Sequence, residues 1–225
     1  RGDIPVALSP MSDSPRFFNP FGEIQKHGAK LPHWEQTGVT YFITFRLGDS
    51  IPQSQLKSWK AERSHWISRH PEPWTESEEA EYHRRFSAEI DRLLDQGTGS
   101  CLLRKPDAAA TLSGVLTHSH KKLYFMHAFV IMPNHVHLLA SLDDETSLAE
   151  KVKIWKGVSA NRINQIVRRE GDLWQKNYFD RIIRDHGHFI RVARYIRTNP
   201  EKGMVKQGEF LLWESEQVRA MLDAQ

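Results

Sequence analysis

The fold is decided by residues 123–142, which read LYFMHAFVIMPNHVHLLASL. Apolar, β-branched and aromatic side chains dominate this stretch on both sides of Pro133-Asn134, a residue pair typical of turns. The two halves, 123–132 and 135–142, therefore predict neighbouring antiparallel strands joined by a short turn. We expect them to form the centre of a sheet.

Other elements are predicted on both sides of this hairpin. Val39–Arg46 is rich in β-branched and aromatic residues and predicts an earlier core strand. Helices are predicted where capping residues and apolar periodicity coincide, at about 52–69, 75–95, 107–117, 147–169 and 185–199. The last helix is expected to end at Asn199, because Pro200 disfavours helical geometry in the residue before it.

The order of these elements predicts an α+β fold in which helices cover a small antiparallel sheet. A chain of 225 residues is long enough for one domain. We expect a mostly flexible tail over residues 1–30, the domain over 31–205 and a C-terminal extension over 206–225. The helices at about 52–117 form an extra insertion in that domain.

Composition narrows the class of protein only slightly. The formal net charge is +3 and the isoelectric point is about 9.0, a weak indication of nucleic-acid binding. Cys101 is the single cysteine, which excludes an intramolecular disulfide and a cysteine-based zinc site. No apolar run approaches the ~20 residues that span a bilayer, so we expect a cytoplasmic protein with no membrane contact.

Two histidines on the second strand of the hairpin are the first candidates for chemistry. His135 and His137 are two positions apart on a strand, so both imidazoles point to the same face while Val136 points to the other. Two adjacent rings on one face can hold one metal ion. Because this chain has twelve histidines, such a pair also arises by chance.

The last predicted helix carries a second group of polar side chains. His188, Arg191, Tyr195 and Asn199 share one of its faces, beside an apolar stripe, and Tyr195 and Asn199 are one turn apart. A tyrosine on a polar face is better placed to react than one in the core. It can equally be a core-rim residue whose hydroxyl lies in water.

Together these segments resemble the IS200-type transposase domain, in particular the REP-associated tyrosine transposases, in which REP stands for repetitive extragenic palindrome. The resemblance covers roughly residues 33–205 and keeps the order of the motifs. It rests on Tyr41–Leu47, Ala128–Leu139, Trp155-Lys156, Asn161–Asn164, Trp174-Gln175, Tyr178–Arg181 and Arg194–Pro200.

The resemblance implies a role for each candidate residue. His135 and His137 would be the histidine-hydrophobic-histidine metal pair, Tyr195 the nucleophile and Asn199 the third metal ligand. Mixed nitrogen and oxygen ligands suit Mg²⁺ or Mn²⁺ better than a closed zinc site. Attack by Tyr195 on a phosphate would leave a 5′-phosphotyrosine and a free 3′ hydroxyl. His188 is a candidate general base by its facing alone.

The implied substrate is single-stranded or hairpin DNA with REP-like palindromes. Basic groups position a phosphate backbone, and aromatic rings stack on unpaired bases. Candidates for these contacts are Lys153, Lys156, Arg162, Trp174, Arg181, Arg184, Arg191 and Arg194. For each of the charged residues, a solvated surface position is an alternative interpretation.

Three other functions remain open at this point. A domesticated chain of the same fold could bind hairpins as a regulator without cutting them. A replication initiator or relaxase shares the histidine pair, although Asn199-Pro200 fits those families poorly. A generic RNA-binding domain would expose aromatic residues where this chain has His135 and His137. The sequence leaves open whether the protein is a monomer or a homodimer. It also leaves open whether the inserted helices widen the DNA platform or contact a second copy.

Overall fold

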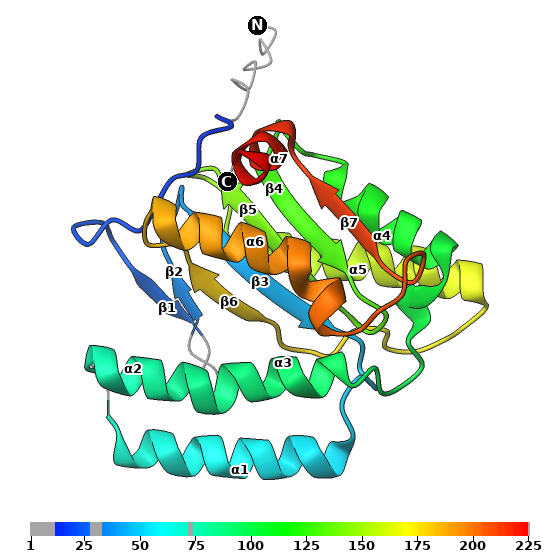
Figure 1. Cartoon of the computed structure of the whole chain (residues 1–225), viewed down its shortest axis with the longest axis horizontal. Helices are drawn as coiled ribbons and strands as arrows, with labels where there is room; N and C mark the ends of the chain where they lie inside the picture. The colour runs from blue at the N-terminus through cyan, green and yellow to red at the C-terminus, as the bar shows by residue number, and fades with distance from the viewer. Residues whose placement is uncertain (1–11, 28–32, 72–73, 225) are drawn as a thin grey trace, which may run out of the picture.

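A five-stranded antiparallel sheet forms the centre of the computed structural model (Figure 1). The structure describes residues 12–27, 33–71 and 74–224. Neighbouring strands follow the order β6-β3-β5-β4-β7, so the predicted hairpin occupies the middle of the sheet. The strands are β3 (Thr40–Arg46), β4 (Tyr124–Ile131), β5 (His135–Leu142), β6 (Phe179–Ile182) and β7 (Leu211–Glu214); β1 (Gln25–His27) and β2 (His33–Glu35) form a separate antiparallel ribbon.

Helices cover both faces of the sheet, which confirms the predicted α+β class. Helices α4 and α5 pack on one face, and α6 and α7 on the other, while α1, α2 and α3 lie beside the sheet (Figure 1). The helices are α1 (Gln53–Arg69), α2 (Glu76–Tyr82), α3 (Ala88–Asp95), α4 (Pro106–Thr117), α5 (Leu148–Val167), α6 (His186–Lys202) and α7 (Glu216–Asp223), with a π-helical turn at His83–Ser87 and a 3-10 turn at Leu102–Arg104.

Central strand β5 divides its side chains between two cores. Val136 and Leu138 belong to the core under α4 and α5. Leu139 belongs to the core under α6 and α7. Because strand side chains alternate, His135 and His137 share the α6 face with Leu139. The predicted common facing of the two histidines is therefore present in the fold.

The predicted helix starts follow their capping residues. Ser147 accepts the N–H of Glu150 at the start of α5, at 3.5 Å. Asp185 accepts the N–H of His188 at the start of α6, at 2.7 Å. Ahead of α2, the Thr75 hydroxyl oxygen accepts the N–H of Glu78 at 3.2 Å. Each cap satisfies an N–H group that lacks a partner within its helix.

Helix α6 continues past Asn199 and ends at Lys202, so the predicted end was wrong. Pro200 lacks an N–H, which removes one hydrogen bond of the helix. The ladder resumes after it, because the N–H of Gly203 donates to the carbonyl oxygen of Asn199 at 3.0 Å. The extra turn places the ammonium group of Lys202 4.7 Å from the ring centroid of Tyr195.

The predicted insertion at 52–117 divides into two parts. Helices α1 to α3 have small cores of their own, one of which joins Trp66, Tyr82 and Phe86. Helix α4 instead belongs to the main core, where Leu112 and Leu116 are fully buried. The insertion that stands apart from the sheet is therefore α1 to α3.

Both ends of the described chain meet the sheet. The expected flexible tail lies outside the described residues at 1–11 and 28–30. Within the described part, the N–H of Phe18 donates to the carbonyl oxygen of Ile183 at 2.9 Å. The N–H of Thr40 donates to the carbonyl oxygen of Arg16 at 2.8 Å. This part differs from the expectation, because its backbone is hydrogen-bonded to the main fold. Near the other end, β7 pairs with β4.

The described helices include none with the length and apolar character that crossing a bilayer requires.

Candidate active site

His135 and His137 face each other inside the protein. Both side chains are buried, and their Nε2 atoms are 3.1 Å apart. The strand geometry produces this approach, because residues two apart on β5 project from the same face. The two nitrogens that could bind a metal ion thus point at one place.

Neighbouring side chains fix the orientation of both rings. His135 Nδ1 lies 2.7 Å from Asn134 Oδ1, and His137 Nδ1 lies 2.7 Å from Thr44 Oγ1. The Asn134 amide has one orientation, because its Nδ2 donates to the carbonyl oxygens of Leu94 and Thr98 at 3.1 and 3.2 Å. Asn134 Oδ1 must then accept a proton from His135 Nδ1. The Nε2 atom of a neutral His135 is left with a free lone pair.

Burial keeps both imidazoles neutral. It lowers the pKa of His135 to about 3. Burial also lowers the pKa of His137 well below its usual range, with smaller contributions from the charges of His135 and Lys202. A histidine binds a metal ion in its neutral form. At neutral pH the pair is therefore ready to bind a cation.

Tyr195 reaches the histidine pair from α6. Its hydroxyl oxygen lies 3.3 Å from His137 Nε2. Phe42 on β3 holds the arrangement, since its ring stacks on His137 with centroids 5.5 Å apart and meets the Tyr195 ring edge-on at 5.8 Å. The facing predicted for Tyr195 is therefore realised in three dimensions, with the ring half-buried.

Asn199 joins this cluster one turn later on α6. Burial raises the pKa of Tyr195, and the nearby Asn199 side chain opposes that rise as the smallest of the contributions. The amide oxygen of Asn199, Oδ1, is buried and has no hydrogen-bond partner among the described residues. A buried amide oxygen without a partner is costly unless something else binds it.

This arrangement fits a divalent metal ion. Nitrogen ligands ~2.1 Å from one ion and at right angles to each other lie about 3 Å apart, close to the 3.1 Å between the Nε2 atoms of His135 and His137. No group of three His, Cys, Asp or Glu side chains suited to a metal is found in the described part of the chain. A third protein ligand must be of another type, and Asn199 Oδ1 has a free lone pair.

Tyr195 is a weak acid in this environment. Burial raises the pKa of its hydroxyl far above the usual value, and the negative charges of Asp91 and Asp95 raise it further. Both carboxylates come from α3, about a hundred residues earlier in the chain. Sequence reasoning missed them, because nothing in their local pattern connects α3 to α6.

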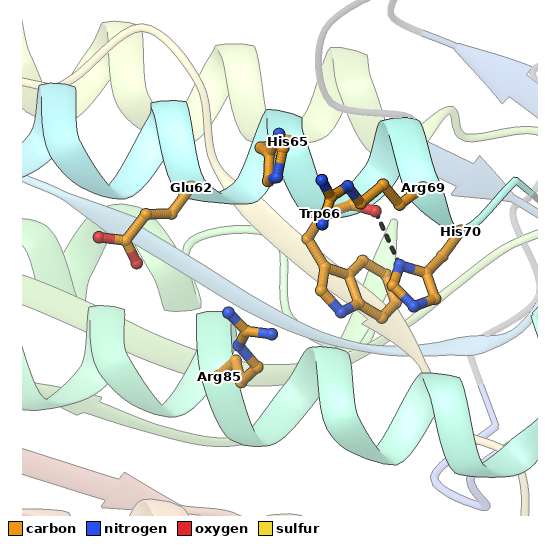
Figure 2. A pocket seen from close by; sticks show the side chains of 6 residues that line it. All are labelled: Glu62, His65, Trp66, Arg69, His70 and Arg85. Carbon is orange, nitrogen blue, oxygen red and sulfur yellow. Dashed lines mark hydrogen bonds between the residues drawn. The ribbon is translucent and has the colours of Figure 1, made fainter.

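A cavity of about 140 Å³ opens beside His135, between the ends of α3 and α6 and the β4–β5 turn; its lining includes Asp95, Asn134 and Gly203. A larger hollow of about 320 Å³ lies between α1 and the π-helical turn (Figure 2). Figure 2 shows the ring of Trp66 lying flat against that of His70, with centroids 4.0 Å apart. None of the predicted site residues lines this second hollow.

The candidate DNA-binding residues fall on both sides of the sheet. Lys153, Lys156 and Arg162 lie on α5, which covers the face opposite to His135 and His137. Lys156 is also tied down, because its ammonium group donates to two backbone carbonyl oxygens at 2.7 and 2.6 Å. These three side chains therefore belong to the helix on the other side of the sheet from the histidine pair.

The position of Trp174 in the fold does not fit the predicted stacking on bases. Its ring is buried, meets Phe45 edge-on at 4.8 Å, and donates its indole N–H to the Ser159 hydroxyl at 3.0 Å. The prediction of a DNA contact is corrected, because this aromatic ring is part of the core.

The remaining basic candidates lie on the side of the candidate site. Arg181 is on β6 and half-buried; Arg184, Arg191 and Arg194 are exposed, before or along α6. They lie on β6, in the segment after it and along α6, the helix that carries Tyr195.

Comparison with known proteins places this site in a family. Residues 105–199 match the family model described as "Transposase IS200 like". This segment, which is less than half of the chain, is similar to the IS200-like transposase family. It contains all four residues of the candidate site and confirms the resemblance seen in the sequence. Helices α1 to α3, with Asp91 and Asp95, lie outside the matched transposase segment.

Individual relatives are distant. An uncharacterized protein of Haemophilus influenzae is 30% identical over 112 residues, which are 40% of this chain and 56% of that protein. A solved structure of a REP-associated tyrosine transposase bound to a REP hairpin overlays with a TM-score of 0.42 at 14% identity, covering 78% of this chain and 74% of that one. A candidate transposase of Deinococcus radiodurans overlays at 0.29 with 16% identity, covering 72% and 90%.

Proposed function

We propose that this chain is a metal-dependent endonuclease and strand-transferase for single-stranded DNA that forms REP-like hairpins. One observation carries the proposal. The Tyr195 hydroxyl lies beside the Nε2 atoms of His135 and His137, and Asn199, with a buried unpartnered Oδ1, follows Tyr195 by one turn of α6, in a segment similar to the IS200-like transposase family.

Tyr195 supplies the nucleophile. Its oxygen attacks the scissile phosphorus, the bond from phosphorus to the 3′ oxygen breaks, and a 5′-phosphotyrosine and a free 3′ hydroxyl result. The covalent bond conserves the energy of the broken linkage. Attack by the same or another 3′ hydroxyl then rejoins DNA and releases Tyr195, which makes the reaction a strand transfer rather than a hydrolysis.

His135, His137 and Asn199 would hold the metal ion, for which Mg²⁺ or Mn²⁺ suits the mixed nitrogen and oxygen ligands. When bound, such an ion polarises a phosphate oxygen and makes the phosphorus a better electrophile. Asn134 and Thr44 keep the two imidazoles aimed at this place through their Nδ1 atoms. Such outer hydrogen bonds fix the orientation of metal ligands and contribute to metal affinity.

The proposed nucleophile and the proposed metal ligands all come from one chain. Tyr195 reaches His137 Nε2 at 3.3 Å without help from a second copy. We therefore propose cleavage by a monomer, with the tyrosine acting on the metal site of its own chain. The hairpin preference is proposed from the family resemblance, with Arg184, Arg191 and Arg194 contacting the phosphate backbone.

The test is covalent capture of hairpin DNA. Purified protein is incubated with Mn²⁺ and a panel of single-stranded hairpins that carry unpaired flanks, each labelled at the 5′ or at the 3′ end. We expect a denaturation-resistant adduct that retains the 3′ label, because the phosphotyrosine holds the downstream fragment. The 5′-labelled fragment should be released with a 3′ hydroxyl.

Single-residue variants test the roles proposed for Tyr195 and His137. Tyr195→Phe and His137→Ala should abolish the adduct, whereas Tyr124→Phe is a matched control. The Tyr124 hydroxyl is buried and donates to the Leu116 carbonyl oxygen at 2.8 Å, in the core under α4 and α5. An adduct formed by Tyr195→Phe would refute the assignment of the nucleophile. Tight hairpin binding with no adduct over the whole panel would instead identify a binding regulator.

A further inference from the structure

One arginine joins α6, the helix of the proposed nucleophile, to the C-terminal part of the chain. The guanidinium of Arg197 forms two hydrogen bonds with Glu214 of β7, because Nε donates to Oε1 and Nη2 donates to Oε2, each at 2.8 Å. Its third nitrogen, Nη1, donates to Oδ1 of Asp223 on α7 at 2.6 Å. A single side chain therefore connects three elements of the fold.

The pair of Arg197 and Glu214 is the directional part of this contact. The Glu214 side chain is 7% exposed and that of Arg197 is 26% exposed, so solvent screens their attraction only partly. Two parallel bonds between a guanidinium and a carboxylate also fix the mutual orientation of the two groups. Asp223 is 60% exposed, and ion pairs in such positions contribute little.

Arg197 and Tyr195 lie on opposite sides of α6, because two residues of a helix are about 200° apart around its axis. Tyr195 points to β3 and β5, where it meets Phe42 and His137. Arg197 points to β7 and α7 instead. In Figure 1, α6 crosses the sheet with β7 and α7 on one side of it and β6 on the other. The guanidinium thus holds the helix from the side away from the proposed nucleophile.

The apolar stripe of α6 leaves the exact rotation of the helix to other contacts. Phe189, Ala193 and Ile196 pack in the core under α6 and α7, but apolar burial has no preferred direction. Helix side chains reach ~5–6 Å from the axis, so rotating α6 by about 10° would move the Tyr195 hydroxyl by ~1 Å. A displacement of this size can slow a reaction by about 100-fold.

We propose that Arg197 is a positioning residue for the reaction. Through Glu214 it sets the rotation of α6, and thereby the approach of the Tyr195 hydroxyl to the histidine pair. This inference rests on the proposed function. Strand β7 and helix α7 lie outside residues 105–199, the segment that is similar to the IS200-like transposase family. The proposal therefore gives the C-terminal extension a role in the site.

The test separates binding from cleavage. Adduct formation with Mn²⁺ is followed in single turnovers over a range of hairpin concentrations, which gives a saturating rate and a half-saturating concentration. Arg197→Lys keeps the charge but lacks the planar fork, and Glu214→Gln keeps the shape but lacks the charge. Each should lower the saturating rate by about 10- to 100-fold and leave the half-saturating concentration unchanged. The double variant should be no slower than Glu214→Gln, because the fork is already lost.

Arg92→Lys is the matched control. Arg92 forms the same fork with Glu89, at 2.8 and 2.7 Å, but both residues lie on α3, so their pair orients no element against another. This variant should keep the wild-type rate. Thermal unfolding first shows that each variant is folded at the assay temperature, and Glu214→Gln carries the test where Arg197→Lys is not.

Three results would overturn the inference. One is a wild-type saturating rate in both Arg197→Lys and Glu214→Gln. Another is a change confined to the half-saturating concentration, which would make Arg197 a DNA contact. The third is an equal loss of rate in Arg92→Lys, which would show that the effect does not depend on α6.

A second measurement needs no activity. In the full chain without DNA, nuclear Overhauser effects between the rings of Tyr195 and Phe42, whose centroids are 5.8 Å apart, should weaken in Arg197→Lys and stay unchanged in Arg92→Lys. Unchanged effects in Arg197→Lys would also overturn the inference. Absence of an adduct in the wild-type protein defeats the proposed function, whereas these effects still test whether Arg197 positions Tyr195.

Discussion

Replacing the half-buried Asp91 by asparagine should stabilise the folded protein at neutral pH. Asparagine has nearly the same shape as aspartate, but it carries no charge. Burial raises the pKa of Asp91 from 3.8 to about 6. At about 1.4 kcal/mol per pH unit, this shift corresponds to at most about 3 kcal/mol of destabilisation by the ionised carboxylate. Because Asp91 is partly exposed, we expect a gain of about 1–2 kcal/mol.

The pH dependence of the gain has a definite sign. The folded pKa of Asp91 lies above the unfolded value, so the fold favours the protonated acid. The cost of ionising it is absent below about pH 4 and complete above about pH 6. The difference in stability between Asp91→Asn and the wild-type protein should therefore grow as the pH rises from 4 to 7.

Thermal unfolding at several pH values measures this difference. For a domain of this size the expected gain raises Tm by about 3–6 °C at pH 7.5. Glu89→Gln, on the exposed side of α3, should give no such increase at any pH. A lower or unchanged Tm for Asp91→Asn at pH 7.5, or a gain that does not depend on pH, would refute the assignment of Asp91 as a strained, ionised group.

Three further predictions test the metal site, the DNA surface and the core. Asn199→Leu should fold at least as stably as the wild-type protein without metal, because Oδ1 has no partner, but should bind Mn²⁺ at least 10-fold more weakly in calorimetric titration. Arg191→Ala should weaken hairpin binding and reduce its salt dependence by about one counterion, whereas Arg162→Ala, across the sheet, should change neither in fluorescence anisotropy. Trp174→Phe should lower the free energy of unfolding by about 1–2 kcal/mol through loss of the bond to Ser159, yet leave hairpin affinity unchanged.

Much of the site could be predicted because its parts are local. Period-two alternation on a strand sets the common facing of His135 and His137. Helical spacing puts Tyr195 and Asn199 one turn apart. Capping residues such as Ser147 mark where helices begin, because they satisfy N–H groups that the helix leaves open. Such patterns depend on residues that are close in the chain, so they can be recognised in the amino-acid sequence.

Contacts between distant segments could not be predicted in this way. A tryptophan such as Trp174 can stack on bases, but in this fold its side chain is buried in the core. Helix α6 passes through Pro200, because the donors that follow it restore the hydrogen-bond ladder. Each outcome depends on which surfaces meet once the sheet has formed.

The sequence by itself determined the α+β class, the central hairpin and the four residues resembling the family site. Only the tertiary structure decided that the end of α3 lies against that site, where the Asn134 amide donates to the Leu94 carbonyl oxygen. The physical reason is that side-chain direction follows from local backbone periodicity, whereas the approach of two helices a hundred residues apart follows from packing of the whole chain. The pKa values of buried groups such as His135 depend on that packing as well.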